Sequence, residues 1–250
     1  GEYKVLVNVP IAIASSVSAS SVPSLSTAFA AKDIQQVKRK VAYSIRFIMI
    51  IAIPCAVGMG VLASPILQLL FGDTRELPAH MMQMGAVSIV FYSLSTLSNG
   101  ILQGINRMNV PVKNAVVALV LHIGVLAALM YGLDLNIYAV VWANTFFSFL
   151  MCVLNGLAIK KYLKYRQEIP RTFVIPSICA AAMGGTVYGA YYFLMQTVKS
   201  NAVSTLVSIA VGAFVYGILL LLLRGLRENE LRSFPMGNLL VRIAKKLHLM

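Results

Sequence analysis

The feature that most constrains the fold of this chain is an apolar stretch from residue 41 to residue 71 that two prolines interrupt. A continuous helix of that length would reach about 45 Å, against about 30 Å for the hydrocarbon core of a membrane. Pro54 and Pro65 each remove a backbone donor, so we predict a bend or break near Pro54 and Gly58 or near Pro65. These three residues are candidate hinges. Because a broken helix at membrane depth needs protein or a water-filled cavity to satisfy its freed carbonyl groups, the segment is expected to face an interior.

The composition indicates a polytopic membrane protein. Of the 250 residues, 59% are apolar and only 12% are charged, and the mean hydropathy of +0.81 is far above that of a soluble domain. Each of seven apolar segments is long enough to cross a membrane as a helix. We therefore predict an all-α transmembrane bundle within residues 1–225, with seven spans near residues 5–31, 41–71, 80–104, 114–132, 137–159, 172–196 and 202–223.

The distribution of basic residues predicts the orientation of the spans. The net charge of +13 would suggest nucleic acid as the partner of a soluble protein. Here, however, the Lys and Arg residues cluster between apolar runs, as in cytoplasmic loops, so no nucleic-acid partner is expected. They occupy the segments 31–41, 104–114 and 159–172 and the tail, whereas the opposite side holds only Lys4, Arg75 and Lys199. The positive-inside rule then puts the C-terminus in the cytoplasm and residue 1 outside.

The two ends of the chain carry further expectations. A start outside the cell without a targeting signal leads us to expect a fragment of a longer protein whose earlier spans are missing. Residues 226–250 are predicted to be a cytoplasmic amphipathic basic tail. Arg242, Lys245 and Lys246 would lie on its polar side against the anionic surface of the inner leaflet.

The first span is the most polar of the seven and is a candidate cavity wall. At 100° per residue, Asn8, Ser15 and Ser26 fall within about 20° of one another and form a polar stripe. Two alternatives stay open. Small polar residues let transmembrane helices pack closely, whereas a water-lined cavity would use the same stripe to hold a polar substrate.

Arg46 lies about five residues inside the second span and also allows two interpretations. Its side chain can snorkel to the cytoplasmic interface. Alternatively, it points into a cavity, where a guanidinium suits an anionic group such as pyrophosphate. Asn99 and Gln103 lie at the cytoplasmic end of the third span and could line the same cavity. The substrate-cavity candidates are thus Asn8, Ser15, Arg46, Asn99 and Gln103.

Other motifs are less informative. His122, inside the fourth span, has either a functional role or a hydrogen bond to a neighbouring helix. Gly185-x-x-x-Gly189 and Ala213-x-x-x-Gly217 offer small faces through which the last two spans can pack as a pair. All eight acidic residues fall outside the predicted spans, and the chain shows no phosphate loop, Ser-His-Asp set or metal-ligand spacing. We therefore expect neither an enzyme, a cofactor nor a metal.

Several segments together resemble a known superfamily. They are residues 8–29 followed by Asp33, the dipeptide Ile53-Pro54, and the runs 62–66 and 70–72. The set resembles the second half of the multidrug/oligosaccharidyl-lipid/polysaccharide exporter superfamily. Residues 101–104 and 230–237 narrow the resemblance to the stage V sporulation protein B and polysaccharide biosynthesis branch, which is related to the lipid II flippases.

The resemblance implies a bacterial cytoplasmic-membrane transporter of about fourteen spans built as two bundles, with this chain as spans eight to fourteen. Its C-terminal bundle would pair with the N-terminal half of the same protein. Such a protein flips an undecaprenyl-pyrophosphate-linked sugar by alternating access, with the last two spans forming a groove for the lipid tail. Two other functions remain open: a drug or cation antiporter of the same superfamily, and a non-transporting membrane scaffold of a glycan-assembly complex.

Overall fold

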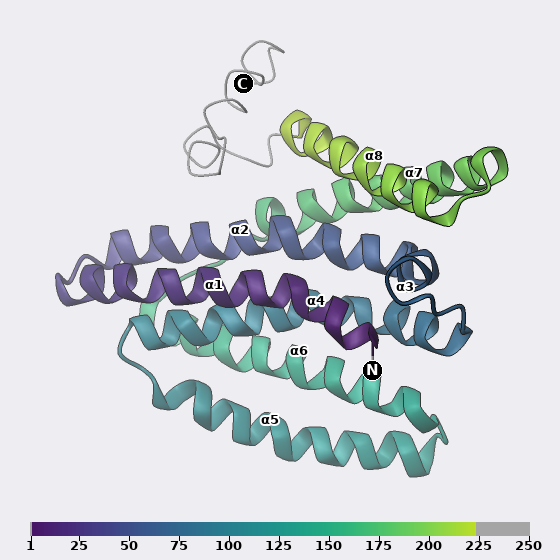
Figure 1. The fold of residues 1–250 in the computed structure, drawn as a ribbon. Helices are drawn as coiled ribbons and strands as arrows, with labels where there is room; N and C mark the ends of the chain where they lie inside the picture. The colour runs from purple at the N-terminus through teal and green to yellow at the C-terminus, as the bar shows by residue number, and fades with distance from the viewer. Residues whose placement is uncertain (1, 224–250) are drawn as a thin grey trace.

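The structure, a computed structural model that describes residues 2–223, is an all-α bundle (Figure 1). The predicted tail 226–250, with Arg242, Lys245 and Lys246, lies outside the described residues. Within residues 2–223, seven helices are long and apolar enough to cross a membrane, as the sequence predicts. The elements are α1 (Glu2–Ala30), α2 (Ile34–Val61), α3 (Ala63–Phe71), α4 (Glu76–Gly104), α5 (Asn109–Ala127), the π-helical turn η1 (Ala128–Gly132), α6 (Asn136–Leu163), the π-helical turn η2 (Pro170–Val174), α7 (Ile175–Val198) and α8 (Asn201–Leu222).

The long helices are stacked so that α4 lies at the centre of the bundle. It packs against α1, α2 and α6, while α5 packs mainly on α6 (Figure 1). In the most apolar part of the span Asn109–Gly132, which contains α5, only 6% of the residues are buried. This is expected for a helix that faces lipid on most sides. α7 and α8 form a separate pair that packs on α2.

The predicted break in the stretch 41–71 lies at Leu62, between α2 and α3. Leu62 has φ −101° and ψ 26°, outside the helical region. Pro65 explains the position of the break, because its ring nitrogen has no hydrogen to donate to the Val61 carbonyl and its ring would collide with that oxygen. α3 then ends at Gly72, whose φ of +65° favours glycine. At Pro54, the other expected place, α2 continues as a helix.

Helix α2 continues through Pro54 because a distant side chain satisfies the carbonyl that this proline leaves without a donor. The residue four positions before Pro54 is Ile50, and the buried phenol of Tyr216 in α8 donates a hydrogen bond of 2.9 Å to the Ile50 carbonyl. A second bond follows at the other proline, where Asn201 Nδ2 donates to the Pro65 carbonyl at 3.1 Å. The amide of Asn201 is itself oriented by the Tyr191 hydroxyl, which donates to its Oδ1 at 3.0 Å. Helix α8 is therefore bound to α2 and α3 near both prolines.

The pairing of α7 with α8 agrees with the sequence, but the glycines at the contact differ from the expected ones. Nothing lies within 4 Å of a Cβ built on Gly185, Gly189 or Gly217. The close approach is at Gly212, where a Cβ would collide with Val187 of α7. Gly184 likewise lies against α2, where a Cβ would be 2.8 Å from Val57 Cγ1. The motifs were misassigned because a small residue marks a close approach only on the face that the rest of the fold turns inward.

The bond between Tyr216 and Ile50 leads to a testable prediction about stability. Tyr216→Phe removes the donor, and we expect it to lower the free energy of unfolding by about 1 kcal/mol, measured by thermal unfolding in detergent. Pro54→Ala supplies a backbone N–H to the same carbonyl, so in that background Tyr216→Phe should have almost no effect. Tyr188→Phe, on the exposed face of α7, is the matched control. An equal loss in both backgrounds would contradict this account.

Candidate functional site

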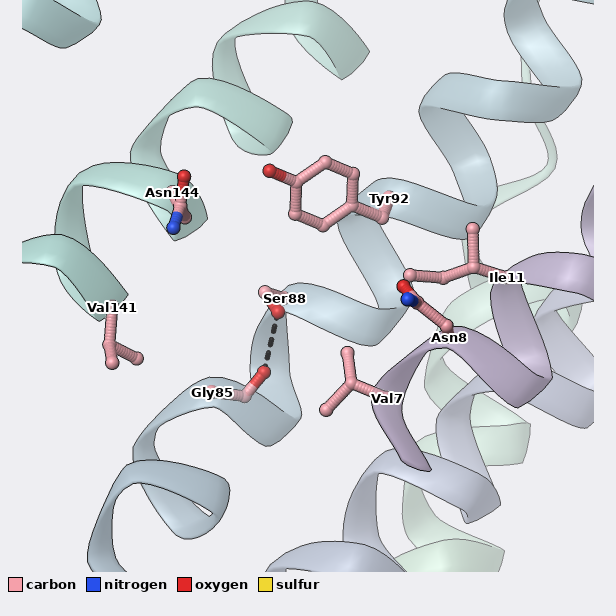
Figure 2. A pocket seen from close by; sticks show the side chains of 8 residues that line it. All are labelled: Val7, Asn8, Ile11, Gly85, Ser88, Tyr92, Val141 and Asn144. Carbon is pink, nitrogen blue, oxygen red and sulfur yellow. Dashed lines mark hydrogen bonds between the residues drawn. The ribbon is translucent and has the colours of Figure 1, made fainter. Parts of the chain in front are cut away.

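A polar hollow lies between α1, α4 and α6, toward the N-terminal end of α1 (Figure 2). It has a volume of about 300 Å³. Its polar side chains are Asn8 of α1, Ser88 and Tyr92 of α4, and Asn144 of α6. The Ser88 hydroxyl donates a hydrogen bond of 2.6 Å to the Gly85 carbonyl. The Tyr92 ring and the Asn144 carboxamide border the open space (Figure 2). Val7, Ile11 and Val141 complete the wall.

A second hollow, of about 770 Å³, opens between α1 and α4 at the C-terminal end of α1. Ser26 and Lys32 border it from the side of α1, and Gln103 and Asn106 from the side of α4. We call the line of contact between α1 and α4, with a hollow at each end, the α1–α4 seam. The predicted stripe follows this seam, because Asn8 borders the first hollow, Ser26 borders the second, and the exposed Ser15 lies between them.

Two glycines of α4 let α1 approach closely along the seam, and the second of them also borders the second hollow. A Cβ on Gly100 would collide with the Ser18 hydroxyl, and one on Gly104 would lie 2.8 Å from Leu25 Cβ. Ser18 Oγ also donates to the Thr96 carbonyl at 3.2 Å. Close packing of small residues, one of the two alternatives for this helix, thus describes the face with Ser18. The stripe with Ser15 is the exposed edge beside it.

The structure places Arg46 away from the α1–α4 seam. Ser44, two positions earlier on α2, faces α1, since its hydroxyl lies 3.2 Å from that of Ser21. Two residues correspond to a rotation of about 200°, so Arg46 projects from the opposite side of α2. Its side chain is only 6% exposed and reaches Glu168 of the segment 164–169, with Nη2 2.7 Å from Oε2. The side chain runs to a connecting segment, as snorkelling requires, but it ends on a carboxylate.

The remaining candidates separate into two environments. Gln103 is exposed at the second hollow. Asn99 lies in a chain of amides across three helices, in which Asn155 Nδ2 donates to Asn99 Oδ1 at 2.8 Å and Asn114 Nδ2 donates to Asn155 Oδ1 at 2.9 Å. His122 of α5 makes the simpler of its two expected contacts, a 2.9 Å hydrogen bond with the Ala143 carbonyl of α6. These interactions fix the packing of α5 and α6 on α4.

Sequence reasoning missed three groups that border the seam or its surroundings. Tyr92 shares a face of α4 with Ser88, Asn99 and Gln103, and this helical spacing was a readable signal. Asn144 gave no signal, since it lies in an aromatic run of α6. Lys40 was assigned to a loop, whereas it lies in α2 and its ammonium donates to the Ser24 carbonyl at 2.9 Å beside the exposed face of α1.

Comparison with known proteins gives two results. The family model described as "Lipid II flippase MurJ" matches residues 4–212. The lipid II flippase MurJ of Bacillus subtilis (strain 168) is 22% identical over 220 residues, an alignment that covers 73% of this chain and 40% of the relative. The chain therefore spans less than half of the length of the curated relative that it matches.

The exposed stripe allows a direct test of its hydration. We expect Ser15→Cys to react with a membrane-impermeant thiol reagent, because a thiolate forms only where water reaches the side chain. The experiment uses the complete protein in membrane vesicles, with the three native cysteines replaced. Val120→Cys, on the exposed face of α5, is the control that should stay unlabelled. Equal and negligible labelling at both positions would show that the stripe is a dry packing face.

The pair of Arg46 and Glu168 generates a second prediction. Glu168→Gln removes the carboxylate that Arg46 Nη2 contacts, and Arg46→Met removes the cation of the pair. We expect a coupling energy of about 1 kcal/mol between the two substitutions in thermal unfolding, reduced from that of a fully buried pair because Glu168 is half exposed. The pair of Asp73 and Arg75, at the same 2.7 Å, is the comparison pair, in which the carboxylate is the buried partner and the guanidinium the exposed one. Additive losses at the first pair would contradict the assignment.

Proposed function

The chain belongs to the family of lipid II flippases, and from that premise we propose that it forms part of a transporter that moves a lipid-linked cell-wall precursor across the membrane. Seven apolar helices and the family indicate a multi-pass protein of the cytoplasmic membrane. Proteins of this family are transporters rather than enzymes, so the residues of interest are those that bind and guide a substrate.

The α1–α4 seam is the observation that carries the proposal. Polar side chains border this seam along α1, from one end of the bundle toward the other, with a hollow of about 300 Å³ at one end and one of about 770 Å³ at the other. A charged head group crossing bare hydrocarbon would lose its hydration at a cost of many kcal/mol. A hydrated seam avoids that cost while the lipid tail of the substrate stays in the bilayer.

We further propose that the substrate is an undecaprenyl-pyrophosphate-linked sugar and that this chain is the C-terminal half of the transporter. The alignment covers 40% of the B. subtilis relative, which supports a match to one part of a longer transporter. The C-terminal position is our proposal. The N-terminal half of the same protein would then close the seam, and alternating access would expose it to each side in turn. Pro54, Gly58 and Pro65 are the proposed hinges, since the α2–α3 break lies next to Pro65.

Charge supports an anionic substrate over a cationic one. Lys32 borders the second hollow, and neither hollow has a carboxylate among the residues that line it. An antiporter for cationic drugs would be expected to present acidic side chains there. The basic loops lie at the same end of the bundle as the second hollow, which by the positive-inside rule is the proposed cytoplasmic entrance and the proposed side of the C-terminus.

The first hollow provides the test of this function. Asn8→Leu combined with Asn144→Leu removes two of its polar side chains, and we expect transport of the lipid-linked precursor by the complete protein to fall by about tenfold. Thr186→Leu, which removes a polar group from an exposed face of α7, is the control and should leave transport unchanged. Undiminished transport by the double variant would remove the hollow from the pathway.

Native mass spectrometry of the complete protein, purified gently from its own membrane, identifies the cargo. A retained polyprenyl-pyrophosphate sugar would support the proposal and reveal the sugar by its mass. Bulk phospholipid as the sole ligand would instead favour the antiporter or the scaffold, and drug efflux would be the next assay.

A further inference from the structure

A cleft of about 520 Å³ lies on the other flank of the contact between α4 and α6, away from the α1–α4 seam. Its floor includes Leu94 and Ser98 of α4. Leu94 is two positions after Tyr92, so it projects from the opposite face of α4 to the side chain that borders the first hollow. The cleft is therefore separate from the proposed substrate path, and its assignment does not depend on that path.

The chemistry of the cleft changes along its length. Its less exposed lining includes the apolar side chains of the buried Ile45 of α2 and the half-buried Leu94 of α4 and Phe173 of η2. At its mouth are two exposed cations, Lys160 in the last turn of α6 and Arg166 in the segment that follows. Neither cation forms a salt bridge with any carboxylate of residues 2–223.

The segment 164–169 is held in place over the mouth by a set of hydrogen bonds. The Tyr165 hydroxyl donates to Gln167 Oε1 at 2.9 Å, and Gln167 Nε2 donates to Thr172 Oγ1 at 2.8 Å. Burial, together with the charge of Glu168, raises the pKa of Tyr165 to about 12, so the hydroxyl keeps the proton that it donates. The Glu168 carboxylate is engaged by Arg46 at 2.7 Å, so the one acid of this segment is held by a counter-ion of its own.

The dimensions of the cleft match one leaflet of a membrane. Cys152 and Gly156 line the cleft along the same helix as Lys160, and the helix rises by about 12 Å over the eight steps from Cys152 to Lys160. Half of the hydrocarbon core is about 15 Å thick. The cations lie at the end of the bundle where the basic loops gather, at the level expected for phosphate head groups.

We propose that this cleft binds one anionic phospholipid, with its phosphate between Lys160 and Arg166 and one acyl chain in the apolar part beside Gly156. The two cations select a net negative head group, and the apolar walls exclude a free phosphate as the preferred ligand. The lipid would bridge α6 to η2, which both line the cleft.

The first experiment removes the cations. The complete protein in detergent is titrated with phosphatidylglycerol, and the lipid that stays bound is counted by native mass spectrometry. We expect Lys160→Gln with Arg166→Gln to weaken the tightest bound lipid by about thirtyfold. Arg39→Gln with Lys113→Gln removes two exposed cations that do not line the cleft and should leave that affinity unchanged. Equal affinity in the two double variants would overturn the proposal.

The second experiment fills the apolar part without changing a charge. No atom lies within 4 Å of a Cβ built on Gly156, so Gly156→Leu fits the helix and also improves its helix propensity. We expect this variant to keep its thermal stability in lipid-free detergent and to lose the tightest lipid. Gly124→Leu, on a glycine of α5 that is equally open, is the control. Retention of the lipid by Gly156→Leu would overturn the placement of the acyl chain.

Two further ligands distinguish the sources of the phosphate. Glycerol phosphate, which has the head group without chains, should fail to displace phosphatidylglycerol, and displacement would show a site for a free phosphate. Phosphatidylcholine, which has the chains without net charge, should bind far more weakly. Equal retention of both lipids would show that the cleft does not select an anionic head group.

Discussion

A backbone carbonyl without a donor is the constraint on which the arrangement of this bundle depends. Pro54 cannot donate to the Ile50 carbonyl, and hydrocarbon supplies no substitute. The Tyr216 hydroxyl of α8, 166 positions later in the sequence, donates the missing hydrogen bond to the Ile50 carbonyl at 2.9 Å. Because Asn201 of the same helix also donates to the Pro65 carbonyl, α8 is fixed to α2 and α3 at two points. These two hydrogen bonds fix the position of the α7–α8 pair, whose two helices pack on each other and on α2.

Helix α2 has two sides that face different neighbours. The side with Ser44 faces α1, and the opposite side with Arg46 faces the segment 164–169 and η2, which leads into α7. The buried Arg46 guanidinium contacts that segment through Glu168. One helix therefore supports two surfaces of different chemistry, a polar seam on one flank of the bundle and a cleft with a cationic mouth on the other.

The sequence was sufficient for properties that depend on composition and on helical period. Seven apolar spans and a break near Pro65 follow from residues close together along the chain, although the sequence offered Pro54 equally as the place of the break. Properties that depend on a distant partner did not follow. Arg46 is paired with Glu168, 122 positions later, and the Ile50 carbonyl that Pro54 leaves without a backbone donor accepts from Tyr216, 166 positions later. The glycines that contact α1 are Gly100 and Gly104, which became recognisable only once α1 and α4 were neighbours.

Hydroxyl and carboxamide side chains beside the seam differ in how their hydrogen-bonding groups are satisfied within a membrane. Along the exposed face of α1 the hydroxyls bind carbonyls of their own helix, as Ser16 binds Ala12 and Thr27 binds Pro23, so the helix itself meets part of their hydrogen-bonding need. The amides at the seam cannot do this, because a carboxamide has more donors and acceptors than one nearby carbonyl can satisfy. Asn8 and Asn144 therefore need water or a polar ligand, whereas the serines beside them do not. The two asparagines are accordingly the side chains whose presence is hardest to explain by packing alone, and they border the same hollow.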